Sequence, residues 1–126
     1  MAIAVATHYE KYLYRSHTIV AETVSTTLEV EAPASGNTLY VVGFELTLGA
    51  AVHVSLTDGS GGTKLWGVLP AANTPCGLPQ VAPELLRKGA PGLRLTAGTS
   101  LYIETASSAV VNGTILTVEL EPGQRW

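Results

Sequence analysis

The clearest pattern in the chain is an alternation of apolar and polar residues between positions 38 and 69. Along Thr38–Leu48 the apolar side chains fall at every second position, at Tyr40, Val42, Phe44, Leu46 and Leu48. Because successive side chains of a strand point to opposite sides, this period predicts a strand with one buried face. The alternation resumes after residue 51, with Val52, Val54 and Leu56 predicted inward and His53, Ser55 and Thr57 outward. The glycine-rich segment 58–62 then predicts a hairpin loop before a further strand over Thr63–Leu69.

Two other segments show the same alternation and predict further strands. In Thr23–Glu31 the predicted inward residues are Val24, Thr26, Leu28 and Val30, and the outward ones are Ser25, Thr27, Glu29 and Glu31. In Thr114–Glu121 they are Leu116, Val118 and Leu120 inward, and Thr117, Glu119 and Glu121 outward. Shorter strands are predicted over residues 17–21, 93–96 and 99–105, with a turn at 107–113.

The segment Pro70–Gly92 interrupts this series of strands. It holds five of the seven prolines, a density that excludes both a helix and a central strand. A connection of this length in a compact domain is usually functional or forms an interface. Its adjacent basic residues Arg87 and Lys88 are therefore candidate interaction residues. The alternative interpretation is a loop that crosses between two sheets.

The two ends of the chain differ from the strands between them. Residues 1–15 include Tyr9, Tyr12 and Tyr14 within six positions, which favours an arm that packs on a neighbouring subunit. The alternative is an edge strand that closes the sheet. At the other end, Pro122-Gly123 ends the last strand, and we expect Trp126 to enter a groove of a neighbour. The alternative is that this tryptophan folds back over a sheet edge of its own subunit.

Seven to nine short strands with turn signals between them predict an all-β fold, an antiparallel β-sandwich of jelly-roll type. A chain of 126 residues is long enough for one such domain. We assign residues 16–121 to the sandwich, 1–15 to an N-terminal arm and 122–126 to a short C-terminal tail.

Composition adds an expectation about association. Hydrophobic residues make up 46% of the chain and charged residues only 13%, which favours a surface partly covered by another subunit. The alternative is a thick core under a hydroxyl-rich surface.

A net charge of −3 with seven basic residues argues against a nucleic-acid partner. No apolar run approaches the ~20 residues of a membrane span. The first 15 residues lack the features of a signal peptide, so we expect use without Sec export.

Candidate chemistry is sparse. The histidines His8, His17 and His53 lack the spacing of metal ligands, so no metal is expected. The loop Gly59–Lys64 joins two predicted strands and opens no helix, which excludes a phosphate-binding loop. No cofactor is expected. The single cysteine, Cys76, lies between Pro75 and Gly77 without an evident base, and we interpret it as an inert small residue.

Acidic residues alternate on two predicted strands, at Glu29, Glu31, Glu119 and Glu121. Paired carboxylates can perform glycosidase chemistry, which requires burial to raise one pKa. Nothing in the sequence predicts such burial, so we interpret these residues as a solvated acidic face. The sequence therefore predicts that the protein is not an enzyme.

Four segments resemble small all-β structural proteins of tailed bacteriophages. They are Ala-x-Gly-x-x-Leu-Tyr-Val-x-Gly-x-x-Leu, within residues 34–48; Val-x-Val-x-Leu-x-Asp-Gly-x-Gly-Gly-Thr-x-Leu-Trp, at residues 52–66; Leu-Arg-Leu-Thr-Ala-Gly-Thr-Ser-Leu, at residues 93–101; and Val-Asn-Gly-Thr-Ile-Leu-Thr-Val, at residues 111–118. The resemblance covers about residues 30–120 and carries over no catalytic residue.

The resemblance implies a virion structural protein, made in the host cytoplasm and assembled on the particle. The first expectation is a capsid decoration protein that binds the major capsid protein as a homo-oligomer, with a trimer favoured, and cements the head. The alternative is a tail or head-fibre accessory module that binds carbohydrate or a receptor. For that module, Trp66 and Tyr102 form the candidate aromatic pair.

Overall fold

The computed structural model describes residues 3–9, 13–78 and 93–123, and these form ten β-strands. The strands are β1 (Ile3–Tyr9), β2 (Leu13–Val24), β3 (Thr27–Glu31), β4 (Thr38–Leu48), β5 (Val54–Asp58), β6 (Thr63–Val68), β7 (Cys76–Leu78), β8 (Leu93–Arg94), β9 (Leu101–Thr105) and β10 (Ala109–Leu120). The described part of the chain contains no helix.

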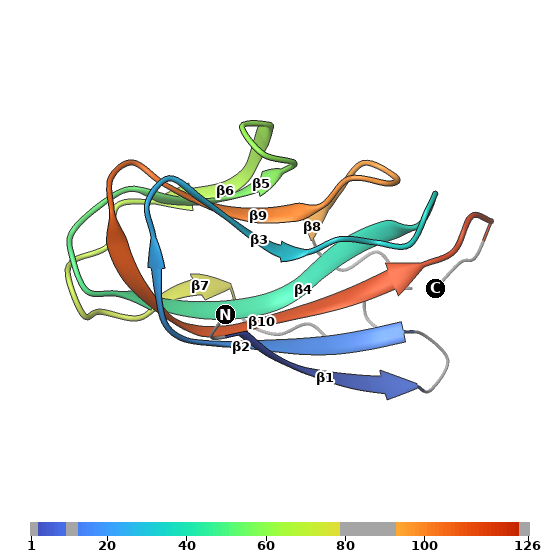
Figure 1. The fold of residues 1–126 in the computed structure, drawn as a ribbon, viewed down its shortest axis with the longest axis horizontal. Coiled ribbons are helices and arrows are strands. Elements are labelled where there is room, and N and C mark those ends of the chain that lie inside the picture. The colour runs from blue at the N-terminus through green and yellow to red at the C-terminus, as the bar shows by residue number, and fades with distance from the viewer. Residues whose placement is uncertain (1–2, 10–12, 79–92, 124–126) are drawn as a thin grey trace.

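The strands form two antiparallel sheets that lie one above the other (Figure 1). The six-stranded sheet has the order β1-β2-β10-β4, and β7 and β8 pair with different parts of β4. The four-stranded sheet has the order β3-β9-β5-β6. The structure thus confirms the predicted all-β antiparallel sandwich.

An apolar core fills most of the space between the sheets. Its least exposed members include Leu39, Leu46, Leu48, Leu56, Leu101, Ile103 and Ile115. Across the interface the Trp66 ring packs edge-on against Phe44, with 4.7 Å between the ring centroids and an interplanar angle of 81°. This geometry is a favoured one for aromatic pairs, and it joins β6 of one sheet to β4 of the other.

A β-bulge in β4 changes which of its residues face the core. Leu116 of β10 pairs with Gly43, whereas Thr117 pairs with Val41, so Val42 is the extra residue. A bulge inserts one residue and so reverses the side-chain alternation beyond it. Phe44, Leu46 and Leu48 face the core as predicted, but Leu39 and Val41 take the inward positions before the bulge. The prediction was wrong for Tyr40 and Val42, which lie on the opposite face.

Strand β10 has the reverse of its predicted orientation. Ile115 lies in the core, and Thr117 and Glu119, which share its side of the strand, are buried as well. Leu116, Val118 and Leu120 instead belong to a small cluster on the other face of the sheet with Val42, Tyr14 and Tyr40. Polar side chains therefore occupy positions between the two sheets.

Strand β5 also departs from the prediction on one face. Val54 and Leu56 are buried in the core as expected. Ser55 and Thr57 were predicted outward, yet they are 5% and 0% exposed. The Thr57 hydroxyl donates a hydrogen bond to the carbonyl of Gly59 at 2.8 Å, which satisfies this buried group. His53 is exposed and precedes the strand.

The N-terminal segment forms an edge strand in the described residues. Residues 3–9 pair with residues 13–19 along the whole of β1 without a register shift. The predicted boundary between arm and sandwich, at residue 15, falls inside β2, which begins at Leu13. Tyr14 and Arg15 are thus part of the sheet.

Candidate functional site

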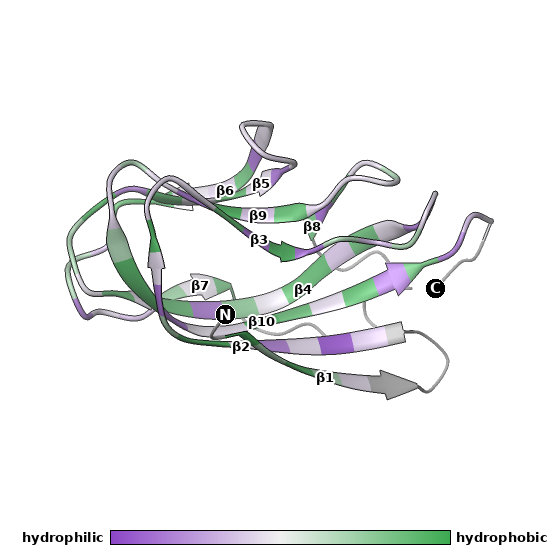
Figure 2. Ribbon diagram, viewed as in Figure 1, coloured by the Kyte–Doolittle hydropathy of each residue, from purple (hydrophilic) through white to green (hydrophobic). Residues whose placement is uncertain are grey.

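A buried polar network connects the two sheets at one end of the interior. It consists of Arg15 and His17 from β2, Glu31 from β3, and Thr117 and Glu119 from β10. Figure 2 shows hydrophilic positions in β2 and at the end of β10. Arg15 is paired with Thr117, and His17 with Ile115, so all of these side chains point inward.

Glu31 is the centre of the network. One oxygen accepts hydrogen bonds from His17 Nε2 at 2.6 Å and from the Thr117 hydroxyl at 2.5 Å, and the other accepts from Arg15 Nη1 at 2.5 Å. The side chain reaches the interior through a bulge, because Glu29 pairs with Tyr102 and Glu31 with Leu101. The extra residue turns Glu31 from the outer face to the inner one.

Glu119 connects the same network to the turn before β4. Arg15 Nη1 donates to one oxygen at 2.5 Å, so a single guanidinium bridges two carboxylates. The other oxygen accepts from the Asn37 side-chain amide at 2.6 Å and from the Ala34 backbone amide at 3.0 Å. Glu119 therefore fixes the turn at residues 33–37 against the sheet.

The electrostatics favour a charged carboxylate at Glu31. Burial by itself raises the pKa of Glu31, but the hydrogen bonds from His17 and Thr117 and the charges of His17 and Arg15 outweigh it, so the pKa is lowered. For Arg15, burial lowers the pKa, but the two carboxylates outweigh this effect and raise it. The network thus holds fixed ionic partners.

This arrangement corrects the interpretation of a solvated acidic face. Glu31 is only 7% exposed and Glu119 only 3%, whereas Glu29 and Glu121 are exposed. The burial does not create a general acid, because such a group needs a raised pKa and that of Glu31 is lowered. Each buried carboxylate also accepts several hydrogen bonds. The described bonds of the network thus join β2, β3 and β10.

One atom of the network has no hydrogen-bond partner among the described residues. This atom is Nδ1 of His17, a side chain that is 2% exposed. Since a carboxylate can only accept, Nε2 carries the proton that bonds Glu31. The described residues hold no group of three or more His, Cys, Asp or Glu side chains arranged for a metal ion.

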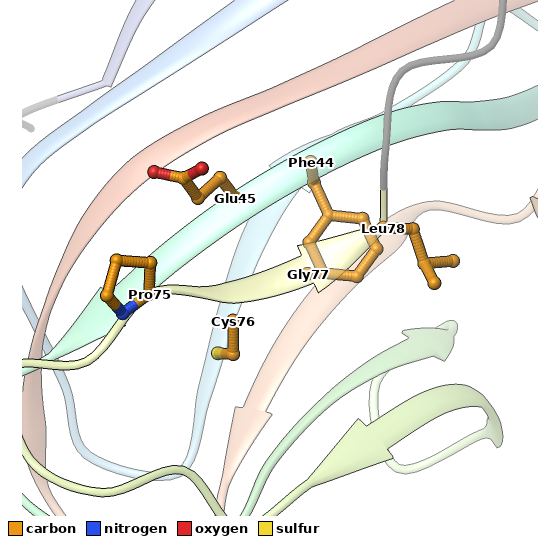
Figure 3. Close-up of a pocket in the computed structure, with 6 residues that line it drawn as sticks. All are labelled: Phe44, Glu45, Pro75, Cys76, Gly77 and Leu78. Atoms are coloured by element: carbon orange, nitrogen blue, oxygen red, sulfur yellow. The ribbon is translucent and has the colours of Figure 1, made fainter.

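An open groove of about 270 Å³ lies beside β7, at the opposite edge of the six-stranded sheet from β1 (Figure 3). Its lining residues are Phe44, Glu45, Pro75, Cys76, Gly77 and Leu78. In Figure 3, Glu45 and Pro75 lie on one side of the β4–β7 pair and Cys76 points to the other. A Cβ atom at Gly77 would lie 2.0 Å from the Phe44 carbonyl oxygen, so only glycine permits this pairing.

Cys76 does not have the environment of a nucleophile. Burial raises the pKa of its thiol, and the thiol donates to the Leu46 carbonyl at 3.4 Å. A reactive cysteine needs a lowered pKa that favours the thiolate. The groove therefore offers no activated group from this side chain.

Three of the seven residues predicted to interact lie in described strands, and the structure does not bring them together. Tyr9 ends β1, and Tyr14 is half-buried on the outer face of the six-stranded sheet, where burial raises its pKa. Trp66 is half-buried against the core. The other four, Tyr12, Arg87, Lys88 and Trp126, lie outside the described residues, as does most of the predicted Pro70–Gly92 connection.

The candidate aromatic pair for carbohydrate is separated by the sheet. Trp66 points inward onto Phe44. Tyr102 alternates with the buried Leu101 and Ile103 and points outward, where its hydroxyl donates to Glu29 at 3.2 Å. The two rings therefore do not form one platform.

Sequence reasoning did not identify Arg15, His17 and Thr117 as partners of the acidic residues. One signal was present, because Arg15 and His17 are two positions apart, as are Thr117 and Glu119. Residues two apart share a strand face, so each strand offers a pair of polar groups to one side. On β10, however, the alternating Leu116, Val118 and Leu120 give the opposite face a stronger apolar signal than the polar pair.

No family model and no curated protein matches this chain. Among solved structures, it is similar to the carbohydrate-binding module CBM6cm-2 of Cellvibrio mixtus lichenase 5A, solved in complex with cellotriose. The identity is 12%, the TM-score is 0.35, and the match covers 91% of this chain and 86% of that module. A likeness at this level carries no argument about function. The described residues include no helix with the length and apolarity to cross a bilayer.

Proposed function

We propose that this chain is a non-catalytic structural protein of a tailed-phage virion, most concretely a capsid decoration protein. The observation that carries the proposal is the use of the buried charged groups. The hydrogen bonds of Arg15, Glu31 and Glu119 hold the two sheets and one turn together. We interpret these charged groups as stabilising the fold. The resemblance of residues 30–120 to small virion proteins supplies the biological setting.

The proposed mechanism is cementing by surface contact. Each copy buries area on adjacent subunits of the major capsid protein and so opposes their separation. Several large apolar side chains are exposed on the described surface and suit such contacts: Val5, Val20, Leu69, Leu78 and Val110. In this proposal the protein acts as a homo-oligomer, for which a trimer is the simplest form on a capsid lattice.

The test is the location of the protein in intact particles. Virions of the phage that encodes this chain are purified, analysed by mass spectrometry, and labelled with gold-conjugated antibody. We expect many copies on the head, and a deletion phage whose heads rupture at lower temperature. Complementation with the wild-type gene is the matched control. Absence of the chain from purified particles would overturn the proposal.

The second candidate, a tail or head-fibre module that binds carbohydrate or a receptor, gives a different result in the same experiment. Antibody would label the tail or the fibres, and the purified protein would bind defined glycans on an array. The open groove lined by Phe44 and Leu78 is one concave surface where such a ligand would be sought. Label on the head with a blank array would exclude this candidate.

A further inference from the structure

The outer edge of β1 is the least protected strand edge of the described sandwich. Strand β1, with the sequence Ile-Ala-Val-Ala-Thr-His-Tyr, contains no Asp, Glu, Lys, Arg, Pro or Gly. It pairs with β2 over seven consecutive residues without a bulge, and no described strand pairs with its other side. A regular, uncharged edge is a template for pairing with another chain.

The other edges carry the features that prevent such pairing. Strand β3 has acidic residues at Glu29 and Glu31 and a bulge between them. Strand β6 has Lys64 and Gly67, and its pairing with β5 is also bulged. Strand β7 has only three residues and follows Pro75. Charges, bulges, prolines and short length are known protections of a sheet edge, and β1 has none of them.

The inner face of β1 extends beyond the opposite sheet. Val5 pairs with His17, whose side chain points between the sheets and bonds Glu31 of β3. Val5 therefore points in the same direction, yet it is 52% exposed. Ile3, two residues earlier, packs against the core. The six-stranded sheet thus presents an inward-directed valine that the four-stranded sheet leaves uncovered.

We propose that β1 pairs in antiparallel fashion with β1 of a second copy of this chain, about a two-fold axis at Ala6. This register places Val5 of each copy opposite Thr7 of the other, and Ile3 opposite Tyr9. Because β1 carries no formal charge, self-pairing sets no like charges opposite each other, whereas two β3 edges would oppose their glutamates. Main-chain hydrogen bonds would join the two six-stranded sheets into one.

The inference deepens the proposed function, on which its biological setting rests, by naming the homo-oligomer contact. A two-fold contact of this kind is isologous and closed, because the same edge is used on both subunits. It produces dimers of the isolated protein. Combined with a three-fold contact it would produce a hexamer of dihedral symmetry, and a lone trimer would leave every β1 edge open.

The first test measures mass in solution by sedimentation equilibrium. We expect the wild-type protein to be dimeric at micromolar concentration, and Val5→Lys to weaken the dimer by roughly tenfold or more, because a lysine on an edge opposes pairing. The matched control is Thr27→Lys, which adds the same charge to the exposed edge strand β3 and should leave the dimer unchanged. Circular dichroism confirms that each variant is folded.

The second test does not depend on tolerance of a charge. In a Cys76→Ser background, Ala6→Cys places one thiol at the proposed axis, where the two copies can form a symmetric disulfide on mild oxidation. Thr18→Cys, on the exposed outer face of the neighbouring β2, is the control and should remain mostly uncrosslinked. Fast, near-complete crosslinking of the first variant alone supports the pairing.

A monomeric wild-type protein, or a dimer that survives Val5→Lys and does not crosslink through position 6, would overturn the inference. Those results leave the virion assignment standing, because gold labelling and mass spectrometry of particles test that assignment separately. Conversely, a β1-paired dimer that is absent from virions would overturn the proposed function alone.

Discussion

The interior of the sandwich has two regions that are stabilised in different ways. In the apolar region, side chains such as Leu46 and Ile103 are fully buried, and stability comes from the area removed from water. In the polar region, Arg15 bridges Glu31 and Glu119, and stability comes from complete pairing of buried charges. The same strand contributes to both, since Ile115 of β10 lies in the first and Glu119 in the second.

The two regions differ in how much stability a single substitution removes. An apolar core loses stability in proportion to the volume that a substitution removes. A buried charge network loses far more when one member is removed than its net contribution suggests, because the remaining charges stay buried without a partner. The polar region is therefore the more fragile of the two to single substitutions.

The largest expected effect is that of Arg15→Met. It leaves two carboxylates in the interior without their shared cation and should lower the free energy of unfolding by about 3–5 kcal/mol. Urea denaturation monitored by circular dichroism measures it. Arg94→Met is the control, because this exposed arginine lies 6.0 Å from the Tyr40 ring and should change stability by under ~1 kcal/mol. Similar small losses for both variants would show that the charge network contributes little.

Leu46→Ala tests the apolar region. The leucine is 0% exposed, so its truncation should cost about 3 kcal/mol through lost burial and an unfilled cavity. Leu69→Ala, at a 56% exposed position, should stay within about 0.5 kcal/mol of the wild type. Both values come from the same urea denaturation series. If the two alanine variants were equally stable, the core between β4 and β9 would not be the one described.

Acid should weaken the polar region and leave the apolar region unaffected. The pKa of Glu31 is lower in the folded state than its ordinary value of 4.5, so its contribution is fully present above that value. The contribution is lost as the pH falls through the folded pKa. Melting temperatures measured from pH 7 down to acid should therefore fall below about pH 4.5.

The matched variant for the pH series is Glu31→Gln, whose side chain is uncharged at every pH. Its melting temperature should start lower at neutral pH and decline less steeply in acid than that of the wild type. Equal slopes for the two proteins would assign the acid sensitivity to other groups.

The smallest expected effect is that of Asn37→Ala. It removes the amide that donates to Glu119 at 2.6 Å, while Arg15 and the Ala34 backbone still bond this carboxylate. A loss of about 1 kcal/mol is expected in urea denaturation. Ser35→Ala, exposed in the same turn, should have no measurable effect. A loss as large as that of Arg15→Met would make the turn, and not the cation, the key element of the network.

The fold class was predictable from the sequence, because side-chain alternation and turn composition depend on local chemistry. The strand Thr38–Leu48 has the same bounds in the prediction and in the structure, and Phe44, Leu46 and Leu48 face the core as expected. The segment 107–113 was predicted to be a turn, but residues 109–113 belong to β10, whose pairing with β2 is irregular between Val111 and Gly113. There a Cβ atom on Gly113 would lie 2.0 Å from the Glu45 carbonyl oxygen.

The candidate site was not predictable, because its position depends on bulges. One extra residue at Val30 turns Glu31 inward, and one at Val42 changes the inward face of β4. Each bulge depends on the partner strand, which comes from a distant part of the chain. In β10 the cause is different: Leu116, Val118 and Leu120 form an apolar cluster on the outer face, so alternation assigned Thr117 and Glu119 to solvent.

The strand order also has a consequence for the timing of synthesis. Strands β9 and β10 are the last two along the chain, yet β9 lies between β3 and β5, and β10 lies between β2 and β4. At ~5–20 residues per second, the 72 positions from Leu48 to Leu120 take the ribosome roughly 4–14 s to translate. Throughout that interval the nascent chain holds β2 and β4 of the six-stranded sheet without β10, the strand that lies between them. Until β10 is made, β2 and β4 expose apolar side chains that can aggregate.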